Sequence, residues 1–84
     1  SPYPGFMTAR VTMYTRAGCH LCDDALQVVS EVCTAQGADF ELVDIDADPA
    51  LRERYGEQVP VVTVDGNTVG FWRIDAEVLR QALA

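Results

Sequence analysis

A long segment with helical periodicity lies between two short segments of β type, and this order restricts the fold more than any other feature of the chain. Residues 10–15 alternate in polarity and are rich in β-branched and aromatic side chains, which predicts a strand. From Cys19 to Gln36 apolar side chains recur at steps of three and four residues, which predicts an amphipathic helix that Gly37 ends. The apolar positions of this helix are Leu21, Ala25, Val28, Val29, Val32 and Cys33. With a second strand over residues 40–45, we expect two parallel strands joined by a right-handed crossover.

A short helix and a hairpin are predicted in the second half of the chain. An aspartate followed by a proline is typical of a helix start, so we expect a helix over residues 48–55 that Gly56 ends. Residues 61–64 and 68–72 predict two strands. The sequence Asp65-Gly66-Asn67 between them is typical of a tight turn, and these two strands are therefore expected to be antiparallel.

A last helix completes the predicted order of elements. Asp75 is suited to cap it, and its apolar residues are expected on one face, namely Val78, Leu79, Ala82 and Leu83. The order β-α-β-α-β-β-α indicates an α/β protein with a four-stranded mixed sheet and about three helices, which cover both faces.

A chain of 84 residues predicts one domain. Ser1–Phe6 is irregular, and we interpret it as an appended remnant or a disordered tail, with a single domain over residues 7–84. No apolar run approaches the roughly 20 residues of a membrane span, and no secretory leader is recognisable. We therefore expect a cytoplasmic monomer without a membrane partner.

The charge of the chain is strongly acidic. The net charge is -7, and the six basic residues are all arginines. Because phosphate binding requires clustered cations, nucleic acid is not expected as a partner.

The chemistry of the chain is concentrated in the motif Cys19-His20-Leu21-Cys22, at the junction of the first strand and the first helix. At a helix N-terminus, free N–H groups and the helix dipole favour an anion. We therefore expect Cys19 to be an exposed thiolate with a lowered pKa and to act as the nucleophile. Cys22, about one turn later, is expected to be more sheltered and to attack the mixed disulfide.

Neighbouring charges are expected to tune this pair. Arg16 and His20 could stabilise the Cys19 thiolate, whereas Asp23 and Asp24 would repel it. The alternative for Arg16 and His20 is a solvated loop position, and for the two aspartates a simple role at the start of the helix.

A metal site is the main rival interpretation of the cysteines. Zinc requires four ligands, and only Cys19, His20, Cys22 and the distant Cys33 are available, so no bound metal is expected. An iron–sulfur cluster shared by two chains remains an alternative. Cys33 falls on the apolar face of the helix, which favours a packing role.

Two segments resemble known redox proteins. The segment Tyr14–Asp23 resembles the active-site stretch of glutaredoxins, and Val59-Pro60-Val61-Val62 resembles the cis-proline segment of thioredoxin-fold proteins. Together with Tyr55-Gly56, the Cys19-His20-Leu21-Cys22 motif resembles a short glutaredoxin-like family of bacterial proteins. The resemblance extends from about Thr8 to Leu83 and implies a thioredoxin fold.

The resemblance also implies roles for individual residues. Cys19 would be the nucleophile and Cys22 the resolving thiol. Pro60 would be cis and would place the backbone of Val59 beside Cys19, where an extended substrate could pair with it. Arg16 occupies the position of a basic residue that contacts the carboxylate of glutathione in glutaredoxins.

One departure from the glutaredoxin pattern concerns the stretch after the last strand. Glutaredoxins that use glutathione carry a Gly-Gly and then an acidic or serine pair, whereas this chain has Gly70-Phe71-Trp72. Phe71 and Trp72 could form an apolar rim that binds a protein partner. The alternative is that they pack against the last helix.

These observations predict a thiol–disulfide oxidoreductase that cycles Cys19 and Cys22 to reduce protein or low-molecular-weight disulfides. No bound cofactor is expected, and glutathione, another small thiol or a reductase would supply electrons. One alternative is a redoxin dedicated to one partner of the ribonucleotide-reductase type and reduced by thioredoxin reductase. Another is a binding module of the same fold without turnover.

Overall fold

The expected β-α-β unit forms the first half of the fold. In the computed structural model, which describes residues 9–84, strand β1 (Val11–Thr15), helix α1 (His20–Gln36) and strand β2 (Phe40–Asp44) follow one another. β1 and β2 are parallel, with Val11 opposite Phe40. The second strand is one residue shorter than predicted, because Ile45 begins a short 3-10 helix, η1 (Ile45–Ala47).

Gly37 ends α1 as the sequence predicts. Its φ of 69° lies in the left-handed region, and its backbone N–H faces the carbonyls of Cys33 and Thr34. A glycine adopts this conformation without the steric cost that a side chain would add. The chain can therefore reverse direction and enter β2 directly.

The second half contains helix α2 (Pro49–Tyr55), strands β3 (Val61–Val64) and β4 (Asn67–Phe71), and helix α3 (Ala76–Leu83). The turn between β3 and β4 is shorter than expected, since Asn67 already belongs to β4. Asp65 and Gly66 have φ values of 53° and 86°, as in the two-residue turns whose twist matches a hairpin. The predicted fourth strand also ends one residue early, before Trp72.

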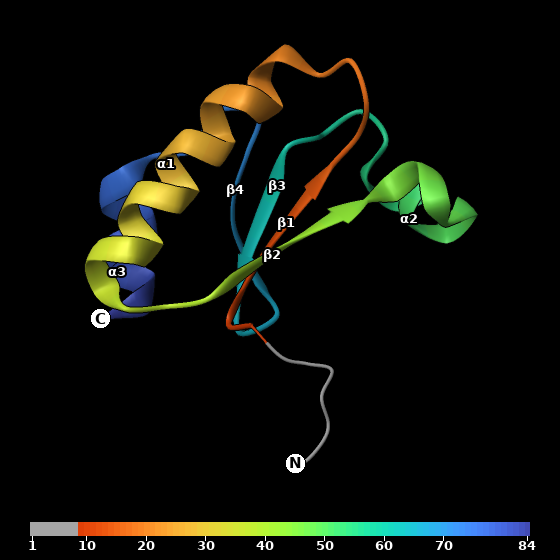
Figure 1. Cartoon of the computed structure of the whole chain (residues 1–84). Coiled ribbons are helices and arrows are strands. Elements are labelled where there is room, and N and C mark those ends of the chain that lie inside the picture. Colours follow the sequence, from red (N-terminus) through yellow and green to blue (C-terminus); the bar gives the residue numbers. More distant parts are fainter. Residues whose placement is uncertain (1–8) are drawn as a thin grey trace.

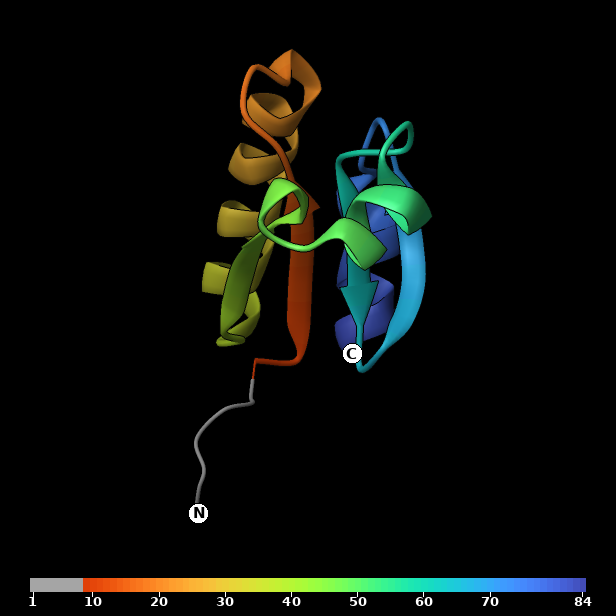
Figure 2. The same ribbon diagram turned by 90° about the vertical axis from the view of Figure 1, so that its right-hand side faces the viewer.

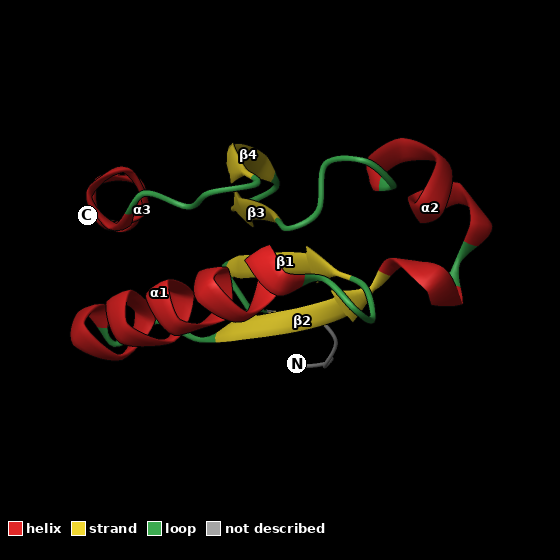
Figure 3. Cartoon of the chain, turned by 90° about the horizontal axis from the view of Figure 1, so that it is seen from above, coloured by secondary structure: helices red, strands yellow, loops and turns green. Residues whose placement is uncertain are grey.

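The four strands form one mixed sheet in the order β2-β1-β3-β4, and β3 is antiparallel to both of its neighbours. Helices α1 and α3 lie on one face of this sheet and α2 on the other (Figures 1 and 3). The predicted fold class, a four-stranded mixed sheet with three helices, is therefore confirmed.

Each face of the sheet has its own apolar cluster. The larger cluster joins the inner faces of α1 and α3 to the alternate residues Val11, Met13, Val62 and Val64 of the sheet. The smaller cluster consists of Ile45, Tyr55 and Val61, beneath α2. Because successive strand residues point to opposite faces, Val61 and Val62 belong to different clusters.

Helix α3 buries a narrower stripe than its sequence suggests. Asp75 caps it through its side chain, which accepts the N–H groups of Glu77 and Val78 at 2.8 and 3.3 Å. Leu79 and Leu83, four residues apart, are buried, whereas Val78 is 46% exposed. The prediction that Val78 shares their face is wrong, because one residue before Leu79 the helix surface has turned by about 100° toward solvent.

The interpretation of Ser1–Phe6 lies outside the described residues. Within residues 9–84, none of the helices combines the length and the apolarity that a membrane crossing requires.

The two neighbouring positions in α3 provide a matched test of the packing. Leu79→Ala should lower the free energy of unfolding by about 2–5 kcal/mol, since it removes a fully buried side chain and leaves a cavity. Val78→Ala should change it by less than about 0.5 kcal/mol. Urea unfolding of both variants measures the difference. Equal losses would contradict the described orientation of α3.

Candidate functional site

Cys19 lies where β1 feeds into α1. Residues 16–18 form the connection, and Gly18, with a φ of 76°, turns the chain into the helix. Cys19 is the N-cap of α1, with extended backbone angles of -95° and 107°. Its side chain is partly exposed, whereas Cys22 is only 5% exposed, so the structure shows the difference in access that the sequence predicts.

The Cys19 sulfur takes the place that an oxygen has in most helix caps. The backbone N–H of Cys22 donates to Cys19 Sγ over 3.2 Å, and the same N–H lies 3.2 Å from the Cys19 carbonyl. The thiol of Cys19 lies 4.0 Å from the carbonyl oxygen of Val59, to which it can donate. These contacts hold the sulfur between the helix start and the backbone of residue 59.

The pKa of Cys19 differs from the sequence prediction. Burial raises the pKa of this thiol, and the neighbouring Cys22 thiol raises it further. The backbone N–H groups of Cys22 and Leu21 lower the pKa, but it still lies above the ordinary value of a cysteine. The prediction of a lowered pKa is wrong for this reduced state, because partial removal from water outweighs the favourable helix N–H groups.

The side chain of Arg16 binds groups other than the Cys19 thiol. Its Nη1 donates to the carbonyl of Gly56 over 3.1 Å, and its Nη2 forms an ion pair with Asp46 Oδ1 at 3.0 Å. Arg16 lines the hollow that contains Cys19, but its charge is not among the influences on the Cys19 pKa. The guanidinium is bound by η1 and by the residue after α2, and tuning of Cys19 by Arg16 stays a prediction.

The other predicted tuning groups lie on the exposed surface of the first turn of α1. His20 and Asp23 line the same hollow as Cys19, and Asp24 follows on the exposed side of the helix. None of the three is among the influences on the Cys19 pKa. Tuning by His20 thus stays a prediction, and Asp23 fits the simpler role of an acidic residue in the first turn of a helix.

The cis-proline segment lies opposite the cysteines, as the resemblance implies. The Val59–Pro60 bond is cis, and β3 begins at the next residue. The start of α1, the segment before β3 and the end of β4 all lie at the same end of the molecule (Figure 2). Val59 and Cys19, which are 40 residues apart in sequence, thereby come into contact.

Phe71 and Trp72 form an exposed apolar rim beside the site. They are 45% and 51% exposed, and their rings meet edge to face with centroids 5.2 Å apart. With Leu21 and Arg73 they line a shallow hollow at the start of α1. This exposure favours the rim over the alternative that both rings pack against the last helix.

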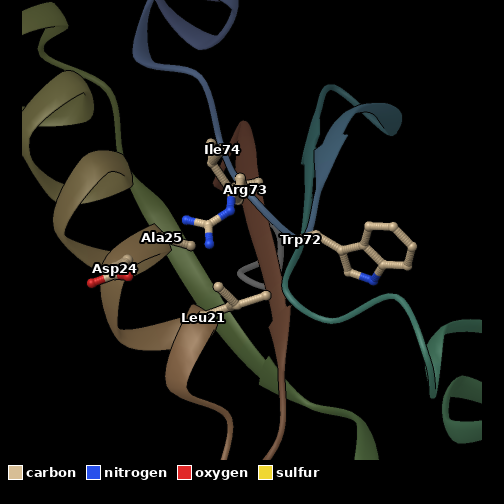
Figure 4. Close-up of a pocket in the computed structure, with 6 residues that line it drawn as sticks. All are labelled: Leu21, Asp24, Ala25, Trp72, Arg73 and Ile74. Atoms are coloured by element: carbon tan, nitrogen blue, oxygen red, sulfur yellow. The ribbon is translucent and has the colours of Figure 1, made fainter.

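One contact of the rim was not foreseen from the sequence. The indole Nε1 of Trp72 donates to the carbonyl of Glu57 over 2.9 Å. The side chain of Trp72 points away from Arg73, Ala25 and Asp24 and toward the segment that follows α2 (Figure 4). No local sequence pattern encodes a bond between an indole and a carbonyl 15 residues earlier.

Cys33 has the packing role predicted for it. It is 1% exposed within the larger apolar cluster, where burial and the charge of Asp39 raise the pKa of its thiol. In the part of the chain that the structure describes, no three histidine, cysteine, aspartate or glutamate side chains are grouped as a metal site would require.

The fold and the site together define a thioredoxin-fold protein with a pair of cysteines at the N-terminus of its first helix. Residues 10–84 match the family described as Glutaredoxin-like domain (DUF836), and the chain belongs to this family.

Relatives and solved structures agree with this assignment. The chain is 32% identical over 80 residues to an uncharacterized protein of Mycobacterium tuberculosis, covering 89% of this chain and 82% of that protein. The X-ray structure of target protein XcR50 from X. campestris is 38% identical, with a TM-score of 0.72 and coverage of 87% and 93% of the two chains. Glutaredoxin from Brucella melitensis is 32% identical, with a TM-score of 0.57 and coverage of 83% and 76%.

The different burial of the three thiols predicts an order of alkylation. Iodoacetamide should modify Cys19 before Cys22 and Cys33, since only Cys19 is partly exposed. Because the pKa of Cys19 is raised, its thiolate fraction, and hence its alkylation rate, should still increase above about pH 8.5, the usual pKa of a free cysteine. Mass spectrometry of labelled peptides across pH measures both effects. A rate that levels off below neutral pH would contradict the raised pKa.

Proposed function

We propose that this protein is a thiol–disulfide oxidoreductase that reduces disulfides with the Cys19–Cys22 pair. The observation that carries the proposal is the placement of the two sulfurs. Cys19 is accessible at the start of α1, and Cys22 is buried one turn later with its N–H on Cys19 Sγ. An accessible attacking thiol with a sheltered second thiol is the arrangement that two-step disulfide exchange requires.

The proposed reaction transfers two electrons in two exchanges. The Cys19 thiolate attacks one sulfur of the substrate disulfide, the substrate S–S bond breaks, and the leaving thiolate takes up a proton. Cys22 then loses its proton and attacks Cys19 Sγ in the mixed disulfide. The second substrate thiol leaves with a proton, and Cys19 and Cys22 are joined as a disulfide.

The electrostatics of Cys19 support reduction as the direction of the reaction. A stabilised thiolate favours the reduced form of a dithiol and makes its disulfide a strong oxidant. Here burial disfavours the Cys19 thiolate and raises its pKa. A Cys19 thiol with a raised pKa fits the proposed role of a reductant better than that of a strong oxidant.

The surroundings of Cys19 support a protein as substrate. The backbone of Val59 lies beside the sulfur, where an extended chain could add as a strand. The rim of Leu21, Phe71 and Trp72 offers apolar surface next to it. The same exposed rim favours the second candidate, a redoxin dedicated to one protein partner of the ribonucleotide-reductase type.

We propose a protein reductase or a small thiol other than glutathione as the electron donor, in the cytoplasm and without a bound cofactor. Glutathione carries two carboxylates, and the guanidinium of Arg16 is already held by Asp46 and Gly56. Phe71 and Trp72 place bulky rings where glutaredoxins that use glutathione carry small or polar residues.

Single replacements of the cysteines test the proposed roles. Cys19→Ser should abolish reduction of insulin disulfides, because the attacking sulfur is lost. Cys22→Ser should accumulate a mixed disulfide between Cys19 and the substrate, detectable as a mass adduct that a reductant removes. Cys33→Ala, the matched control in the core, should retain the reaction in its folded fraction. Full turnover by Cys19→Ser would refute the proposal, and a wild-type protein that binds disulfide peptides without reducing them would identify a binding module.

The electron donor is tested by NADPH consumption in two coupled assays. One contains glutathione and glutathione reductase, and the other contains thioredoxin reductase. We expect the second to be faster, because Arg16 is occupied and the rim is apolar. A clearly faster glutathione assay would contradict this expectation and would indicate an ordinary glutaredoxin.

A further inference from the structure

Trp72 has a backbone conformation that a tryptophan rarely adopts. Its φ of 64° lies in the left-handed region, where the side chain crowds the backbone. Such residues persist where surrounding contacts compensate for the strain, and they are frequent at functional sites. Neighbouring residues in a strand point to opposite faces, yet the rings of Phe71 and Trp72 touch. The left-handed turn at the end of β4 thus redirects the indole.

Two hydrogen bonds hold Trp72 in this conformation. Its backbone N–H donates to the carbonyl of Pro60 over 2.9 Å, and its indole Nε1 donates to the carbonyl of Glu57, also over 2.9 Å. Trp72 is 51% exposed, so burial does not explain the orientation of its ring. Figure 4 shows it directed at the segment after α2, away from the side chains of Arg73, Ala25 and Asp24. Trp72 therefore binds the first and the last residue of the segment 57–60.

Arg16 binds the residue that precedes this segment. Its Nη1 donates to the carbonyl of Gly56 over 3.1 Å, next to the carbonyl that Trp72 binds. Two consecutive carbonyls are thus bound by a side chain from the end of β1 and by one from the end of β4. The segment leads directly to Val59, whose carbonyl lies 4.0 Å from Cys19 Sγ.

We propose that Trp72 is a positioning residue, which fixes the segment 57–60 so that the backbone of Val59 faces Cys19 and is ready to pair with a substrate chain. This inference rests on the proposed disulfide reduction. Trp72 would contribute in two ways. Its ring surface is part of the apolar rim, and its indole N–H donates to the carbonyl of Glu57.

The decisive variant replaces Trp72 by benzothienylalanine, which keeps the bicyclic ring and substitutes sulfur for the N–H. The KM for a protein disulfide should rise about fivefold, the effect of one lost neutral hydrogen bond, while kcat stays the same. Trp72→Gly relieves the strain of the positive φ and should therefore retain the thermal stability of the wild type. Its KM should be at least as high as that of the benzothienylalanine variant. Val78→Ala is the control for an exposed apolar residue, and its KM should equal that of the wild type. A wild-type KM for the benzothienylalanine protein would overturn the proposal.

A second measurement tests the bond without turnover. In NMR spectra of the wild type, the indole N–H of Trp72 should exchange with water more slowly than in the urea-unfolded chain. The benzothienylalanine variant should show greater backbone motion at Glu57 and Val59. An indole that exchanges as fast as in the unfolded chain would overturn the positioning role even if disulfides are reduced. A protected indole in a protein that reduces no disulfide would instead refute the proposed function.

Discussion

The parallel pairing of β1 with β2 is the constraint on which the rest of the structure depends. Because the two strands run in the same direction, the connection between them must travel back along the sheet, and α1 provides it. The start of α1 is thereby fixed at the carboxyl end of β1. The N-cap of that helix is Cys19, so the same crossover that builds the core also presents a sulfur to the helix N–H groups.

The antiparallel strand β3 supplies the other half of the site. It pairs with β1 on the side opposite β2 and begins next to the carboxyl end of β1, with Val61 opposite Tyr14. The residues just before it, Val59 and Pro60, must therefore arrive beside Cys19. Trp72, just beyond β4, is brought to the same end by the β3–β4 hairpin. Sheet order thus brings three distant segments to one end of the sheet, where Val59 contacts the Cys19 sulfur.

The charge state of Cys19 depends first of all on its partial burial. The chain is acidic and has six arginines, and the one nearest to Cys19 in sequence binds Asp46 and a backbone carbonyl. Without a cation on the sulfur, partial burial dominates and the Cys19 pKa rises. The arginine and the rim tryptophan contribute to the site through the backbone that they hold.

The sequence by itself determined the features that depend on a few neighbouring residues. Helical periodicity predicted the position of α1 and the burial of Cys33. Asp48 and Asp75 indicated where two helices start, and the CxxC spacing identified the two sulfurs of the site. The tertiary structure alone decided the partners of long side chains. Arg16 binds groups 30 and 40 residues away, and the indole of Trp72 binds a carbonyl 15 residues earlier. Caps and periodicity are local, whereas an extended side chain takes whichever donor or acceptor the folded chain brings within reach. The exposure of Val78 has the same origin, because how much of α3 is covered depends on the sheet and on α1, not on the helix itself.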